Sequence, residues 1–152
     1  MSRKSQLETP NSKVERKKEP AKYKHLLLEM AVPTWKRFEE MDVWKKACQL
    51  ACSIYDITRQ GQLAKDFAFR DQLRRSAVSV ASNVAEGFER GSDKVFANSL
   101  AIAKGSSGEL RTQLYIAARL GYVEADRMQA LVAEAEEISR MLSGLIKHLK
   151  PS

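Results

Sequence analysis

The feature that most constrains the fold of this chain is a series of four segments in which apolar residues recur every three or four positions. An α-helix repeats about every 3.6 residues, so this spacing places the apolar residues along one side of each helix. The clearest seam is in the last segment, at Met128, Leu131, Ala135, Ile138, Leu142, Leu145 and Leu149. Such a narrow seam is typical of helices that pack in a bundle.

Capping and turn residues place the ends of these four predicted helices. The helices are expected at about 42–61, 66–87, 92–121 and 124–150. Asp42 and Ser92 are predicted N-caps, and Gly121 suits a left-handed C-terminal cap. The stretch from Gly87 to Gly91 is predicted to break the chain between the second and third helices. Short links make successive helices antiparallel neighbours, so we predict an all-α, up-down-up-down four-helix bundle.

The basic charge of the chain is concentrated at one end. The net charge is +7, and residues 1–37 hold ten Lys and Arg against four Asp and Glu. Residues 38–152 hold sixteen against fifteen. The first part also lacks an apolar period, so we predict a disordered basic extension over 1–37. The second part is long enough for one hydrophobic core and is the predicted bundle domain, 38–152.

Several classes of protein are disfavoured. No apolar run approaches the roughly 18 residues that a membrane span needs, and no secretory signal pattern follows the basic start. Cys48 and Cys52 lie one helical turn apart, which is poor geometry for a disulfide, and neither has a neighbouring His to share a metal. We therefore expect a cytoplasmic protein with no cofactor, no metal and no membrane contact.

A second apolar stripe on the first two predicted helices indicates self-assembly. It carries Trp44 and Tyr55 on one helix, and Val78, Ala81 and Ala85 on the other. Apolar patches of several hundred Å² are uncommon on monomers, so these five residues are the predicted oligomer interface. The alternative is a monomer with one wide core.

Basic residues of the bundle form a candidate nucleic-acid site. The candidates are Arg70, Arg74, Arg75, Arg90 and Lys94. Repeated around a ring, they would form a positive belt able to neutralise phosphates. The alternative, which the sequence favours slightly, is that Arg74 and Arg75 make structural ion pairs with nearby acids.

Polar residues also recur at helical spacing. The predicted polar seam consists of Ser79, Asn83, Glu86 and Glu109. The two histidines, His25 and His148, lie far from this seam in sequence, so no nucleophile–base pair can be built. We interpret the seam as fixing helix register or subunit docking, and we predict that the chain is not an enzyme.

Three runs of sequence resemble a known family: DVWKKA at 42–47, QLRRSAVS at 72–79 and SNVAEG at 82–87. They look like the four-helix bundle family of bacterial ribosomal-RNA intervening-sequence proteins, and the accessory variability protein of diversity-generating retroelements is similar. The resemblance covers about 38–149. It implies a ring-shaped homopentamer without catalytic activity. In the retroelement branch it also implies binding to nucleic acid and to a reverse transcriptase, the latter only where one is encoded nearby.

One position departs from that family, which often has proline where this chain has Ala81. Without proline the second helix is expected to run straighter. Two classes of function remain open from the sequence. The first is an oligomeric accessory protein associated with RNA or DNA, and the second is a structural or protein-binding scaffold whose charges serve assembly.

Overall fold

A computed structural model describes residues 34–149 of the chain. Its elements are η1 (Phe38–Glu40), α2 (Asp42–Thr58), α3 (Gly61–Lys65), α4 (Phe67–Glu89), α5 (Asp93–Arg119) and α6 (Ala125–Leu149). Every element in this part of the chain is helical, which confirms the predicted all-α bundle. Most of the predicted basic extension lies outside the described residues, and the structure below is that of the compact unit beginning at Trp35.

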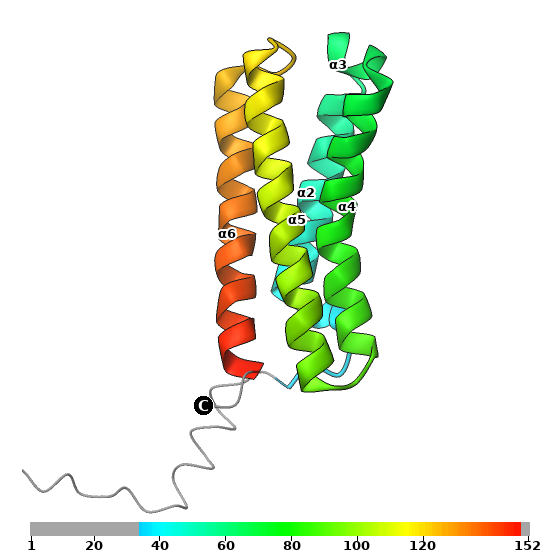
Figure 1. Ribbon diagram of the computed structural model, residues 1–152, viewed down its shortest axis with the longest axis vertical. Coiled ribbons are helices and arrows are strands. Elements are labelled where there is room, and N and C mark those ends of the chain that lie inside the picture. Colours follow the sequence, from blue (N-terminus) through cyan, green and yellow to red (C-terminus); the bar gives the residue numbers. More distant parts are fainter. Residues whose placement is uncertain (1–33, 150–152) are drawn as a thin grey trace, which may run out of the picture. The chain divides into compact units, whose positions relative to one another are not determined.

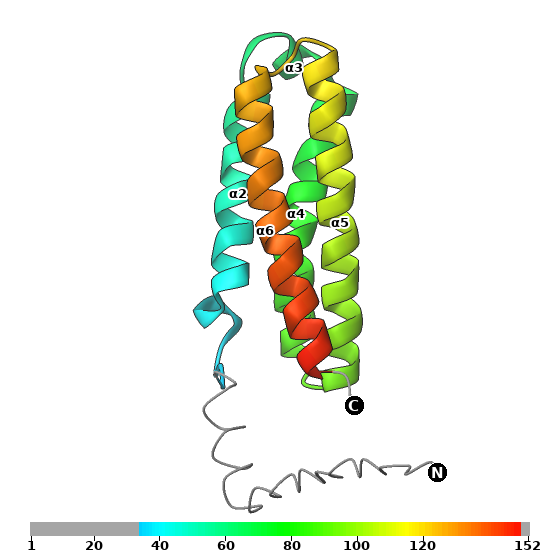
Figure 2. The ribbon, with the colours of Figure 1, turned by 90° about the vertical axis from the view of Figure 1, so that its left-hand side faces the viewer.

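The four long helices run alternately in opposite directions along the bundle (Figure 1). They pack as a square, in which α2 contacts α4, α4 contacts α5, α5 contacts α6 and α6 contacts α2. Figure 2 shows α6 lying between α2 and α5. The short helix α3 lies at the end of the bundle where the chain passes from α2 to α4. The α2–α4 side and the α5–α6 side are therefore opposite sides of the square.

The predicted apolar seams supply most of the core, and Met41 and Leu63 add to it from outside them. Its largest fully buried side chains are Met41, Leu50, Ile54, Leu63, Leu73, Val80, Leu100, Leu110, Leu114, Leu131, Ile138 and Leu142. All four long helices contribute, so apolar surface is removed from water along the whole bundle, which is the main force holding it together.

One of the two predicted N-caps is wrong. Asp42 is the first residue of α2, and Met41 occupies the cap position without a side-chain bond. Met41 is instead fully buried in the core. Ser92 does cap α5, because its hydroxyl accepts a hydrogen bond from the N–H of Val95.

The helix ends also differ from expectation. The first helix stops at Thr58, and Gly61, with φ of 57°, begins α3, which was not predicted. Helix α4 runs through Gly87 to Glu89, so the predicted break is confined to the turn around Gly91, whose φ is 76°. It also continues without interruption past Ala81, where the family often has proline. At the other end of α5, Gly121 has φ of 73°, in keeping with its predicted cap.

Candidate functional site

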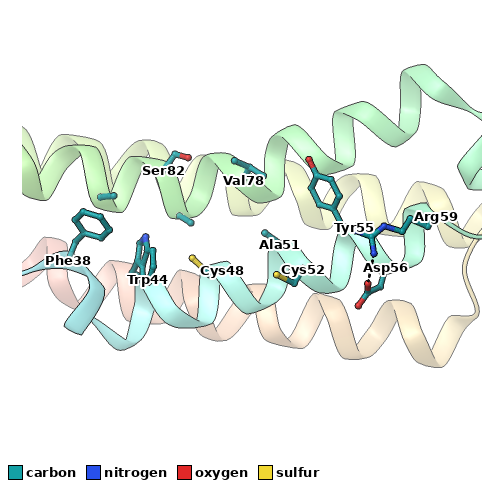
Figure 3. A pocket seen from close by; sticks show the side chains of 12 residues that line it. Phe38, Trp44, Cys48, Ala51, Cys52, Tyr55, Asp56, Arg59, Val78 and Ser82 are labelled. Atoms are coloured by element: carbon teal, nitrogen blue, oxygen red, sulfur yellow. Dashed lines mark hydrogen bonds and ion pairs between the residues drawn. The ribbon is translucent and has the colours of Figure 1, made fainter.

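An apolar groove of about 800 Å³ lies between α2 and α4 (Figure 3). It is lined by Phe38, Trp44, Cys48, Ala51, Cys52, Tyr55, Asp56, Arg59, Val78, Ala81, Ser82 and Ala85. All five residues of the predicted oligomer interface are in this lining. The fold therefore brings the second stripes of the two helices together on one surface.

The two ends of the groove differ in chemistry (Figure 3). At one end the rings of Phe38 and Trp44 meet edge to face, with centroids 5.3 Å apart. At the other end Asp56 and Arg59 form an exposed ion pair at 3.3 Å. Trp44 was in the predicted interface, but Phe38 belongs to η1, which the sequence did not predict, so this second ring was missed. The only available signal was the pair of aromatic residues Trp35 and Phe38 just before the first predicted helix.

Two free cysteines lie along the α2 wall. Cys48 is half-buried and Cys52 is exposed. Burial raises the pKa of the Cys48 thiol, and the neighbouring Cys52 raises it further. A raised pKa keeps the thiol in its unreactive protonated form, so Cys48 contributes to the groove as a small apolar side chain.

Arg74 ties α4 to the end of α2. Its guanidinium lies 4.5 Å from the ring centroid of Tyr55, a cation–π arrangement, and its Nε donates to the hydroxyl of Thr58 at 2.8 Å. Thr58 is buried and in turn donates to the carbonyl of Ile54 at 2.8 Å. Arg74 therefore has a structural role, through an aromatic ring and a hydroxyl instead of the acidic partner that the sequence suggested.

Two other residues of the predicted basic site are also engaged within the fold. Arg70 pairs with Asp71 at 3.2 Å and donates to the carbonyl of Ala64 at 3.2 Å. Arg90 pairs with Glu86 one turn earlier in the chain. These contacts occupy donors that a phosphate would need.

The remaining candidates do not restore a single patch. Arg75 and Lys94 are exposed, and neither forms an ion pair with another described residue. Arg70 is in the first turn of α4 and Arg90 follows its last residue, so about 30 Å of helix separates them. The predicted belt is thus divided between the two ends of the bundle.

The predicted polar seam is formed in part. The hydroxyls of Ser79 on α4 and Ser106 on α5 lie 2.8 Å apart, and the amide of Asn83 donates to the carbonyl and hydroxyl of Ser79. Glu86 is exposed and turned toward Arg90. Glu109 is exposed and has no side-chain hydrogen bond or ion pair to another residue in the described part. The half-buried part of the seam links α4 to α5 through the contact between Ser79 and Ser106.

The described part of the chain offers no geometry for a metal. Within residues 34–149, no cluster of three or more His, Cys, Asp and Glu side chains is placed to hold an ion. None of the helices in this range has the length and apolar character to cross a membrane.

Comparisons with known proteins agree with the fold. Residues 39–144 match the family described as 23S rRNA-intervening sequence protein. Among solved structures, the chain is similar to a protein of unknown function from the S23 ribosomal protein family of Bacteroides thetaiotaomicron. The two are 27% identical, the match covers 69% of this chain and 98% of the other, and the TM-score is 0.64. No curated protein matches the chain. With a family match over most of its length, this chain belongs to the 23S rRNA-intervening sequence protein family.

Proposed function

We propose that this protein is a non-catalytic subunit that assembles with copies of itself into a closed ring. The observation that carries the proposal is the apolar groove between α2 and α4. Trp44 and Tyr55 are only half-buried there, and Val78 is 42% exposed. Covering these side chains would remove apolar surface from water, which favours association.

A second exposed apolar surface is available to pack into that groove on a neighbouring copy. It is a strip on the outward side of α5, consisting of Val95, Ile102, Ile116 and Leu120. Their spacings of seven, fourteen and four residues place them on one side of the helix. The groove and the strip are different surfaces of one chain, so their contact is heterologous, and a heterologous contact that closes produces a ring. Five subunits is the number that the family resemblance implies.

We further propose that the assembly associates with RNA. The net charge of +7, concentrated in residues 1–37, supports this, because a ring multiplies it by the number of subunits. The name of the family, which refers to 23S rRNA, also supports it. The competing proposal is a structural or protein-binding scaffold, and the internal contacts of Arg70, Arg74 and Arg90 favour it.

Size-exclusion chromatography of the full chain, with light scattering to measure the mass, tests the assembly. Wild type should have a multiple of the 17.2 kDa subunit mass. Val78→Glu, in the groove, and Ile102→Glu, in the strip, should each be a helical monomer. Gln129→Glu makes the same charge change at an exposed position of α6 outside both surfaces and should assemble normally. A monomeric wild type would contradict the proposal.

Mixing the two interface variants tests the heterologous arrangement. Val78→Glu keeps an intact strip and Ile102→Glu keeps an intact groove, so the mixture retains one working junction. It should form a heterodimer and nothing larger. If the groove instead paired with the groove of a second copy, Ile102→Glu would dimerise on its own, without Val78→Glu.

Fluorescence polarisation with unrelated RNA and DNA at low and high salt separates the RNA proposal from the scaffold proposal. An RNA-associated ring should bind at low salt and lose affinity steeply as salt rises, because binding releases counterions from the phosphates. A scaffold should bind neither nucleic acid at either salt concentration.

A further inference from the structure

A second groove, of about 490 Å³, lies between α5 and α6, on the side of the bundle opposite the apolar groove. It is lined by Lys104, Arg111, Glu136, Ser139, Arg140, Ser143, Gly144 and Lys147. Four of these residues are basic and one is acidic. Since residues 38–152 as a whole are nearly neutral, this is a local concentration of positive charge.

The four cations are arranged as two facing rows. Lys104 and Arg111 are seven residues apart on α5, and Arg140 and Lys147 are seven apart on α6. Seven residues are close to two turns, so both members of each pair lie on the same side of their helix, about 10.5 Å apart along it. The two helices pack antiparallel, and each supplies one wall.

Small residues keep the space between the walls open. Ser139 is buried and Ser143 half-buried, and neither side chain extends beyond a hydroxyl. Gly144 adds no side chain, and a Cβ placed there would have no neighbour within 4 Å. The groove therefore has no large apolar side chain in its lining, in contrast to the groove between α2 and α4.

The positive charges of the groove are poorly neutralised. The one ion pair joins Arg111 Nη1 to Glu136 Oε1 at 3.8 Å, beyond the 2.7–2.9 Å or so of a charge-assisted hydrogen bond. Lys104, Arg140 and Lys147 form no ion pair with any residue in the described range. By contrast, the acid Glu137 on α6 pairs with Lys46 on α2 at 3.1 Å. Glu137 therefore does not neutralise the cations of this groove, and Glu136 is its only acidic lining residue among those described.

Arg111 also holds an unused donor. Its Nε is buried and has no hydrogen-bond partner in the described structure. A buried donor without an acceptor carries an unfavourable desolvation free energy. Because this atom is shielded from solvent, an anion in the groove would meet the terminal nitrogens of the guanidinium. The planar guanidinium suits a phosphate, because it can donate two parallel hydrogen bonds to two phosphate oxygens.

We propose that the groove between α5 and α6 binds backbone phosphates of a nucleic-acid strand. The inference rests on the proposed RNA association and names a surface of the bundle that contributes to it, beside the charge of residues 1–37. Rows of cations about 10.5 Å long suit successive phosphates of a strand better than one free anion. Phosphate contacts carry no sequence information, so binding here is independent of sequence. The site differs from the predicted belt, in which Arg70, Arg74 and Arg90 are engaged within the fold.

The test compares two double variants of the full chain. Lys104→Gln with Arg140→Gln removes one cation from each wall. Arg119→Gln with Arg127→Gln removes the same charge from exposed positions of the same two helices, outside the groove. A labelled single-stranded RNA of mixed sequence is titrated between about 50 and 200 mM salt. The slope of log affinity against log salt should become shallower by about 1.4 in the groove variant, about 0.7 per lost contact, and stay near wild type in the control.

The outcomes separate the groove from the general RNA proposal. If both double variants bind like wild type, or weaken equally, the groove is not the site, while RNA association stands. If wild type does not bind RNA even at low salt, RNA association fails and the groove proposal fails with it. Displacement of the RNA by inorganic phosphate at constant ionic strength would indicate a single-anion site and would also overturn the proposal.

Discussion

Gly87 on α4 lies directly against Ser99 on α5. A Cβ added at Gly87 would be 2.4 Å from the Cβ of Ser99 and 2.9 Å from its hydroxyl oxygen. Both residues are buried, and Gly87 is inside the helix instead of ending it. The glycine is therefore explained by the close approach of two helices, since at this distance no side chain fits between them.

The first prediction follows from this contact. Gly87→Ala should destabilise the protein by about 1–3 kcal/mol, the usual result of overfilling a packed core. Gly105→Ala is the matched control, because its Cβ would meet no atom within 4 Å, and it should be stabilising by about 0.5–1 kcal/mol. Denaturant unfolding measures both. If Gly87→Ala is as stable as Gly105→Ala, α4 and α5 are not this close.

The second prediction concerns a buried hydrogen-bonded pair between α5 and α6. Ser107 donates to the carbonyl of Ala135 at 3.0 Å, and its oxygen lies 2.9 Å from that of Ser139. A hydroxyl has one hydrogen, so Ser139 must be the donor to Ser107. Ser107→Ala alone leaves Ser139 without its acceptor and should cost about 1–3 kcal/mol. Replacing both serines by alanine should cost less than the sum of the two single changes. Additive free energies of unfolding would show that the two hydroxyls are not coupled.

The third prediction is a loss of stability at alkaline pH. The hydroxyl of Tyr122 donates to Asp66 Oδ2 at 3.1 Å, and this bond, followed by desolvation, raises the pKa of Tyr122. A raised pKa in the folded state stabilises the fold below the unfolded pKa of about 10, and this stabilisation is lost as pH rises through the folded pKa. Unfolding free energies measured across that range should fall for wild type and fall less for Tyr122→Phe. Identical pH profiles would exclude the bond.

The fourth prediction concerns alkylation of the two cysteines. Only the thiolate reacts, and the pKa of Cys48 is raised by burial and by Cys52. In the folded protein Cys48 should therefore need a higher pH for alkylation than it needs in the denatured chain. Cys52→Ser should shift the Cys48 profile part of the way back. Mass spectrometry of labelled peptides follows each site, and superimposable folded and denatured profiles would refute the prediction.

The fold could be predicted from the sequence because burial in a bundle depends on local periodicity. Leu131, Ala135, Ile138 and Leu142 are all buried, as their spacing required. The details that failed depend on tertiary contacts. Met41 holds the cap position of α2 and is buried in the core, and Gly87 lies inside α4 where Ser99 approaches too closely for a side chain. Neither partner is visible from a local pattern.

The candidate sites show the same division. The part of the apolar groove that α2 and α4 supply was predictable, because the second stripes lie on two adjacent helices, whereas Phe38 of η1 was not. The basic site was not predictable, because whether an arginine is free to bind a phosphate depends on its partners in the fold. Arg74 on α4 contacts Tyr55 and Thr58, which lie on α2. The groove between α5 and α6 was missed altogether. Lys104 and Arg140 face one another only once the register of the two helices is known.

The unlike ends of the apolar groove give it a direction. A helix entering it would meet two aromatic rings at one end and an Asp–Arg pair at the other, and reversing that helix would exchange those neighbours. An insertion that tolerates only one orientation makes every subunit point the same way around the assembly. A ring built in this manner has two distinct faces, so whatever it meets on one face need not be met on the other.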